Sequence, residues 1–308
     1  MAFEVMKAAS DERKLPEQTV SGIDSDQGCP RTGIVPGGQS VSRELVVALH
    51  CSGSNAGPWH QLGDMLGDDY TLIAPEHYGN AQSGPWPGEH VFTLADEAMQ
   101  TIALIDGAER KVHLVGHSYG GGVALHAALA RPHCISSLSL YEPSAFHLLK
   151  EMGAQGAEAL AEILAVTHET GRRVIVGDYR RAAAGFVDYW GGDGAWSALR
   201  PQQQVELTRW APKAPLEWAA LIEETTEPAE YSDLRFPVLL MRGERAPTPT
   251  RLIAERLIGL LPNARLVVIS GAGHMGPFTH RSEVNALIVS HASERAAIAL
   301  QAAKSRRQ

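Results

Sequence analysis

From Arg43 onward, short apolar runs rich in β-branched residues alternate with longer stretches of helical periodicity. This alternation restricts the possible folds more than any other feature of the chain. Six apolar runs predict strands, at residues 44–50, 70–76, 111–117, 135–142, 236–244 and 264–270. Helical patterns lie between or after them, at residues 58–66, 93–106, 119–130, 249–261 and from Arg281 onward. We therefore expect an α/β fold in which helices cover both faces of a mainly parallel sheet.

The alternation is interrupted between about His147 and Glu230, where a mainly helical stretch replaces a single crossover helix. We interpret residues 147–230 as a helical cap inserted into a core made of residues 44–146 and 231–308. Residues 1–43 are rich in Gly, Pro, Ser, Asp and Gln and show little periodicity. They are interpreted as a loosely ordered N-terminal extension.

Aromatic residues gather in the predicted cap, which holds four of the six tryptophans. Trp190, Trp196 and Trp210 are candidates for contact with a substrate, because the cap would enclose space above the sheet. The alternative is that these tryptophans only pack the cap onto the core.

Charge and composition exclude several classes of partner. The chain has 27 basic and 35 acidic residues and a net charge of −8, so neither nucleic acid nor an anionic membrane is an expected partner. No stretch approaches the roughly 20 apolar residues of a membrane span, and the first residues lack a signal-peptide core. We expect a soluble, cytoplasmic protein. No metal-ligand or dinucleotide-binding spacing is present, so we expect no metal and no cofactor.

The sequence Gly116-His117-Ser118-Tyr119-Gly120 follows a predicted buried strand and begins a predicted helix. A G-x-S-x-G pattern in this context is typical of a sharp turn that exposes a nucleophilic serine at the carboxyl end of a sheet. The alternative is a tight glycine-rich turn with an incidental serine. We take Ser118 as the candidate nucleophile.

A serine hydroxyl needs an adjacent base to act as a nucleophile at neutral pH. His274 follows the last predicted strand in a glycine-rich loop, which can bring its imidazole to the same sheet edge as Ser118. An oxyanion hole needs two backbone donors, and we expect the N–H groups of Tyr119 and Ser52 to supply them. Cys51 and Gly53 are the neighbouring alternatives to Ser52, and a flexible surface turn is the alternative for the whole loop.

Together these motifs resemble those of the α/β-hydrolase family over residues 44–308. The matching segments are a histidine-led loop (50–59), the segment 74–84, GHSYGG (116–121), YEP (141–143) and GAGH (271–274). One departure is Cys51, which stands where family members usually have a glycine after the loop histidine. The resemblance implies a triad that contains a carboxylate.

The position of the carboxylate differs from the usual family pattern. Members commonly carry the acid in a G-x-x-D pattern after the strand predicted at 236–244, but Ala246 occupies the acid position here. Some members carry the acid after the preceding strand, where this chain has Glu142. Glu142 is therefore ranked first and Glu244, which falls two positions early, is the alternative. A purely structural role at the end of the strand remains open for Glu142.

A serine, a histidine, a carboxylate and an oxyanion hole are suited to acyl transfer. We expect a cofactor-free hydrolase that cleaves a small, partly apolar carboxylic ester or thioester through an acyl-enzyme on Ser118. The alternative activities are those of a lactonase, a C–C bond hydrolase or a perhydrolase. An alternative from another class is a non-catalytic ligand-binding protein of the same fold. The oligomeric state is left open.

Overall fold

The computed structural model describes residues 43–80 and 83–305, with side chains described as far as Glu294. The extension predicted for residues 1–43 therefore lies, apart from Arg43, outside the described residues.

The core contains one sheet of six strands in the order β2-β1-β3-β4-β5-β6, and each pair of neighbours is parallel. The strands are β1 (Glu44–Leu49), β2 (Tyr70–Ile73), β3 (Val112–His117), β4 (Ile135–Tyr141), β5 (Val238–Gly243) and β6 (Ala264–Ile269). The predicted parallel α/β sheet is confirmed. The prediction of a strand over 70–76 is too long, because residues 76–80 leave the sheet and bind the loop that follows β1.

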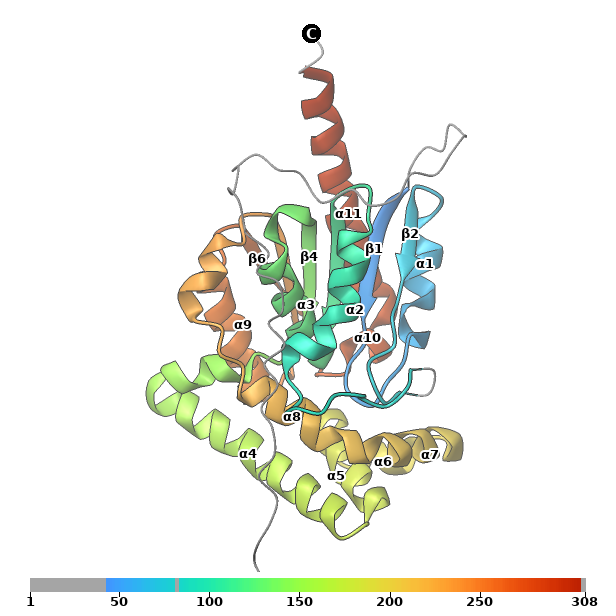
Figure 1. Cartoon of the computed structure of the whole chain (residues 1–308), viewed down its shortest axis with the longest axis vertical. Helices are drawn as coiled ribbons and strands as arrows, with labels where there is room; N and C mark the ends of the chain where they lie inside the picture. The colour runs from blue at the N-terminus through green and yellow to red at the C-terminus, as the bar shows by residue number, and fades with distance from the viewer. Residues whose placement is uncertain (1–42, 81–82, 306–308) are drawn as a thin grey trace, which may run out of the picture.

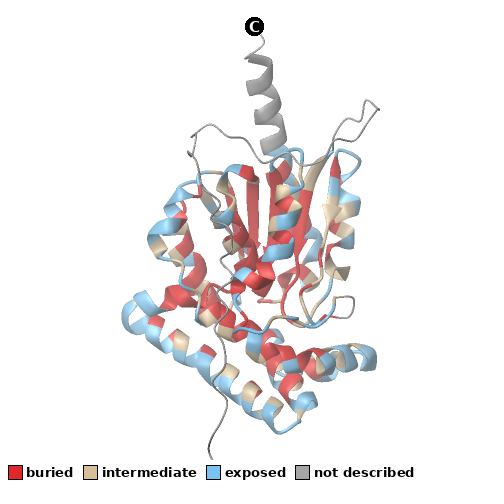
Figure 2. Cartoon of the chain, in the orientation of Figure 1, coloured by how far each residue is buried: buried red, intermediate tan, exposed pale blue. Residues whose placement is uncertain are grey.

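Helices cover both faces of the sheet (Figure 1). One face packs against α2 (Leu94–Asp106), α3 (Tyr119–Ala130) and α9 (Thr248–Leu260), and the other against α1 (His60–Leu66) and α11 (Arg281–Ser305). Along β1, Val47 and Leu49 join the first apolar layer whereas Val46 and Ala48 join the second, as the period of two in a strand requires. Figure 2 shows the resulting core as buried strands between helices whose outer faces are exposed.

The helical insertion lies between β4 and β5 in the chain. It contains α4 (Gly153–Ile175), α5 (Tyr179–Gly191), α6 (Ala195–Ala198), α7 (Pro201–Trp210) and α8 (Ala214–Ile222). These helices form a layer at one end of the sheet (Figure 1). Contacts of this layer with the loop after β1 and with the loop after β6 show that it covers the carboxyl ends of the strands.

Short elements complete the chain. They are the 3-10 turns Gly57–Trp59, Pro132–Cys134, Phe146–Glu151, Ala211–Lys213 and Pro228–Asp233, and the short helix α10 (Gly276–Thr279). Helix α2 starts with a capping box: the Thr93 side chain accepts from the Asp96 N–H, and the Asp96 carboxylate accepts from the Thr93 N–H. None of the helices within the described residues is both long and apolar enough to cross a bilayer.

The turn from β3 into α3 packs backbone directly against backbone. A Cβ atom added at Gly120 would lie 2.5 Å from the carbonyl oxygens of both Leu49 and His50. A Cβ added at Gly116 would lie 2.6 Å from the carbonyl oxygen of Gly120. A Cβ at Gly121 would meet the Pro143 Cα at 2.8 Å. The glycines thus allow β1, β4 and α3 to approach one another at a single point.

This crowding predicts opposite effects for two glycine-to-alanine substitutions. Gly120→Ala forces the backbone of the turn apart, and we expect a loss of about 1–3 kcal/mol or more in the free energy of unfolding. Gly171→Ala, in α4, adds a methyl group where no atom lies within 4 Å, so better helix propensity should increase that free energy by up to about 1 kcal/mol. Urea denaturation measures both; equal stabilities would contradict the prediction.

Candidate active site

Ser118 occupies the sharp turn between β3 and α3. Its φ of 54° and ψ of −117° lie in a region that non-glycine residues rarely adopt. Hydrogen bonds hold this conformation: the Ser118 N–H donates to the Tyr141 carbonyl at 3.0 Å, and the Ser118 carbonyl accepts from the N–H groups of Gly121, Gly122 and Ser144. The neighbouring strand and helix therefore fix a strained backbone that presents the hydroxyl.

His274 lies between Ser118 and Glu142. Its Nε2 is 2.9 Å from the Ser118 Oγ, and its Nδ1 is 2.8 Å from the Glu142 Oε2. The carboxylate can only accept, so the assigned tautomer donates from Nδ1 and leaves Nε2 free to accept the serine proton. The structure thus brings together the serine, the histidine and the carboxylate ranked first from the sequence.

Glu142 follows β4 directly and is fully buried, with a positive φ of 41°. Besides the His274 contact, its Oε1 accepts from the Gly243 N–H at 2.8 Å, and its Oε2 accepts from the Thr250 hydroxyl at 2.8 Å. These bonds orient the carboxylate and compensate its burial. Thr250 was not singled out from the sequence, since it lies in the first turn of a helix 108 positions away.

Glu244, the alternative acid, lies exposed at the end of β5. It accepts from the Gly271 N–H at 2.8 Å and from the Ser270 hydroxyl at 3.1 Å. The Gly271 hydrogen bond, followed by that of Ser270, lowers the pKa of Glu244. Its bonds hold the start of the loop that carries His274, and none of them reaches the imidazole.

His117 lies beneath the imidazole of His274. It is buried, and its Nε2 is 2.9 Å from the His274 carbonyl, to which it donates. Burial, together with the nearby His274, lowers the pKa of His117 well below its usual range. A neutral His117 therefore braces the backbone of the loop.

Ser52 and Tyr119 have backbone N–H groups without an acceptor in the part of the chain that the structure describes. The close approach of Gly120 to the His50 carbonyl shows that the loop after β1 lies against the start of α3. Two unpaired donors therefore belong to two adjoining segments, as an oxyanion hole requires.

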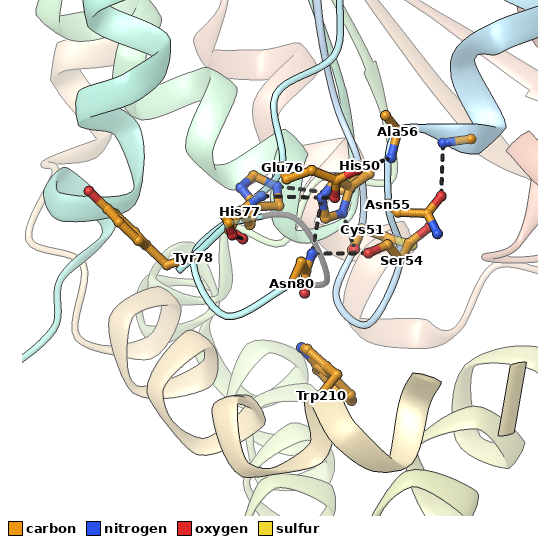
Figure 3. A network of polar contacts seen from close by, with 12 residues as sticks. His50, Cys51, Ser54, Asn55, Ala56, Glu76, His77, Tyr78, Asn80 and Trp210 are labelled. Carbon is orange, nitrogen blue, oxygen red and sulfur yellow. Dashed lines mark hydrogen bonds and ion pairs between the residues drawn. The ribbon is translucent and has the colours of Figure 1, made fainter. Parts of the chain in front are cut away.

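The loop after β1 is held by side chains from residues 76–80 (Figure 3). The three contacts are His77 Nε2 to the His50 carbonyl (3.0 Å), Asn80 Nδ2 to the Ser54 carbonyl (2.9 Å) and the Ala56 N–H to Glu76 Oε1 (3.0 Å). Because the backbone of the loop is fixed on several sides, its free N–H groups are preorganised. The sequence indicated this loop but not its supports.

Cys51 is buried within the same loop. Burial raises the pKa of its thiol to about 12, so the group stays protonated at neutral pH. A protonated, buried thiol is a poor nucleophile, so Cys51 is a small buried side chain of the loop.

The three candidate tryptophans occupy different places in the cap. The Trp190 ring, in α5, lies with its centroid 4.1 Å from that of His274. Trp210 ends α7 beside Gly53, where an added Cβ would come within 3.1 Å of its ring. Trp196 packs in a separate apolar cluster between cap helices, with Ala182 among its neighbours. The structure therefore brings Trp190 and Trp210, but not Trp196, to the loops of the site.

A buried ion pair joins the cap to the core. The Lys213 ammonium, after α7, lies 2.6 Å from the Glu97 carboxylate of α2 and 3.3 Å from that of Glu217 in α8. The Tyr119 hydroxyl donates to the same Glu97 oxygen at 2.7 Å, and the Trp210 indole donates to Glu217 at 3.0 Å. This network was missed from the sequence, where its members look like ordinary charged helix residues.

Glu97 remains ionised in this network although burial alone would raise its pKa. Hydrogen bonding and charge from His77, followed by the charge of Lys213, outweigh burial and hold the pKa of Glu97 well below 4.5.

Within the described ranges, no three His, Cys, Asp or Glu side chains are placed to hold a metal ion.

Comparison with known proteins gives a consistent result. The sequence model described as "Alpha/beta hydrolase family" matches residues 46–287. A polyketide synthase, ThaQ of Burkholderia thailandensis, is 28% identical over 260 residues, which cover 82% of this chain but only 12% of that protein. The pimeloyl-[acyl-carrier protein] methyl ester esterase of Edwardsiella ictaluri is 28% identical over 245 residues, covering 78% of this chain and 89% of that protein.

The fold is shared with solved structures. An alpha/beta hydrolase from Sphaerobacter thermophilus superposes with a TM-score of 0.62 at 20% identity, covering 81% of this chain and 93% of that one. At this identity the likeness concerns the fold alone.

The buried ion pair predicts a large cost for removing its cation. Lys213→Met leaves the Glu97 and Glu217 carboxylates buried without the ammonium, and we expect a loss of about 3–5 kcal/mol in the free energy of unfolding. Arg251→Met is the control, because Arg251 forms an exposed pair with Glu255 and its loss should matter little. Denaturant titration at pH 7 measures both variants. Similar midpoints for the two would show that the buried pair is no more costly to break than the exposed one.

Proposed function

Because the chain belongs to the alpha/beta hydrolase family, we propose that it is a hydrolase that cleaves a small, partly apolar carboxylic ester or thioester through an acyl-enzyme on Ser118. The observation that carries this proposal is the continuous chain of hydrogen bonds from Ser118 through His274 to Glu142. Membership of this family of enzymes argues against the non-catalytic binding protein considered from the sequence.

In the proposed reaction, His274 Nε2 takes the proton of Ser118 while Oγ attacks the substrate carbonyl. The N–H groups of Ser52 and Tyr119 stabilise the negative oxygen of the tetrahedral intermediate. Collapse of the intermediate expels the alcohol or thiol, which receives the proton from Nε2. A water molecule, deprotonated by the same nitrogen, then attacks the acyl-enzyme; the bond between the acyl carbon and Oγ breaks, Oγ takes the proton back from Nε2, and the acid is freed. Glu142 holds the imidazole and balances its positive charge.

The surroundings of the site support a partly apolar substrate. Trp190 and Trp210 add aromatic surface from the cap beside His274 and beside Gly53. A carboxylic ester is favoured by the name of the Edwardsiella relative, which describes a methyl ester esterase. No metal or dissociable cofactor takes part in the proposed steps.

The proposed nucleophile predicts covalent labelling by a fluorophosphonate probe. An activated serine attacks phosphorus as it attacks a carbonyl, so we expect one adduct at Ser118, located by mass spectrometry of peptides. Ser118→Ala should abolish labelling while the circular dichroism spectrum stays unchanged. An adduct at another serine, or none on the folded wild-type chain, would exclude Ser118 as the nucleophile.

The two strand-end acids predict different kinetic effects. Glu142→Gln keeps the shape but removes the charge beside His274, and we expect kcat to fall by on the order of 10²–10⁴. Glu244→Gln is the matched control at the next strand, and kcat should fall by less than about tenfold because its bonds only support a loop. Both are measured on one aryl ester. A greater loss for Glu244→Gln would reverse the assignment of the acid.

A further inference from the structure

Trp190 covers the imidazole of His274 from the cap. The two ring centroids are 4.1 Å apart and the planes are inclined by 34°, a tilted arrangement that is closer to parallel than to perpendicular. Trp190 is buried, with 7% of its surface exposed, and His274 is 3% exposed. The contact is therefore largely shielded from water. Electrostatic attraction between the two rings is reduced less at such a buried place than at the surface.

The other side chains that contact His274 do not occupy the place over its ring where Trp190 lies. Among the described residues, Glu142 and His117 are the titratable side chains that contact the imidazole by hydrogen bonding or ring packing. Glu142 binds at Nδ1, in the plane of the ring. His117 lies 5.2 Å away between centroids, and its burial keeps it neutral. The Lys and Arg side chains that lie over aromatic rings in the described part of the chain do so at Trp196, Phe92 and Tyr119, and none lies over the indole of Trp190.

We propose that Trp190 is a positioning residue for the base: its indole face stabilises the imidazolium form of His274 and holds the ring in the plane that joins Ser118 to Glu142. This inference rests on the proposed function, in which His274 Nε2 takes the serine proton. The imidazole is neutral before that transfer and positive after it. An aromatic face attracts a cation more strongly than a neutral ring, so the contact strengthens as the transition state forms.

This role has a kinetic signature that packing alone does not produce. An interaction that strengthens only in the transition state changes kcat, whereas an aromatic wall that only holds substrate changes KM. Stabilising the protonated base also raises the pH at which it loses its proton. Removing the aromatic face should therefore move the acidic limb of the kcat/KM profile to lower pH.

The test compares Trp190→Phe with Trp190→Leu, which are both apolar and smaller than tryptophan but differ in the aromatic face. We expect the Phe variant to retain kcat within about threefold and the Leu variant to lose about tenfold, with similar KM values. The acidic limb of the Leu variant should lie about half a pH unit below that of the Phe variant. The substrate is 4-nitrophenyl butyrate.

Trp218 provides the matched control. It is buried in α8 and packs against Phe186 at 5.8 Å, outside the proposed machinery. Trp218→Phe and Trp218→Leu should lose stability in a similar way but differ from each other in kcat by less than about twofold, with the same acidic limb. All variants are measured below their unfolding temperatures.

Labelling by a fluorophosphonate distinguishes failure of the proposed function from failure of the role of Trp190. If the wild-type chain does not label at Ser118, the proposed function fails. If it labels but the Phe and Leu variants of Trp190 share the same kcat and the same acidic limb, the role assigned to Trp190 is wrong. That role is also wrong if the two variants differ only in KM, since Trp190 would then only line the substrate site.

Discussion

Backbone crowds against backbone where β3 turns into α3, and the geometry around Ser118 depends on this crowding. Gly120 lies against the end of β1 and Gly121 against the residue after Glu142, with no space for a side chain at either contact. The turn therefore sets the distance between three segments that reach it from different strands. One of these segments carries Ser52, another carries Ser118 and Tyr119, and the third carries Glu142.

The cap completes this arrangement through two contacts of different character. Lys213 forms a buried ion pair with Glu97, which also binds the hydroxyl of Tyr119, so a charge in the cap supports the residue next to the nucleophile. Trp190 packs against the imidazole of His274 and shields that side of the ring from water. An ion pair at this depth adds little net stability but is costly to break on one side, so it favours one position of the cap over others.

Local patterns in the sequence were sufficient to predict the strands, the turn at Ser118 and the loop of His274, because each of these segments is encoded within about ten consecutive residues. Glu142 could be ranked first only by comparing two strand ends. Glu97, Lys213 and Thr250 could not be predicted, since their roles depend on partners more than 100 positions away. The end of β2 was misplaced for a different reason: Glu76 leaves the sheet and binds the loop after β1, which lies only 20 positions earlier in the chain.

The carboxylate that contacts His274 belongs to the residue directly after β4, so under the proposed function the turn after β5 takes no part in proton transfer. Glu244 supports the loop of His274 through two hydrogen bonds, while Arg245 and Ala246 connect β5 to α9. This connection must keep its shape but has no fixed chemistry to preserve. Its side chains can therefore be exchanged as long as the backbone hydrogen bonds of Glu244 and Arg245 to the segment before His274 are kept.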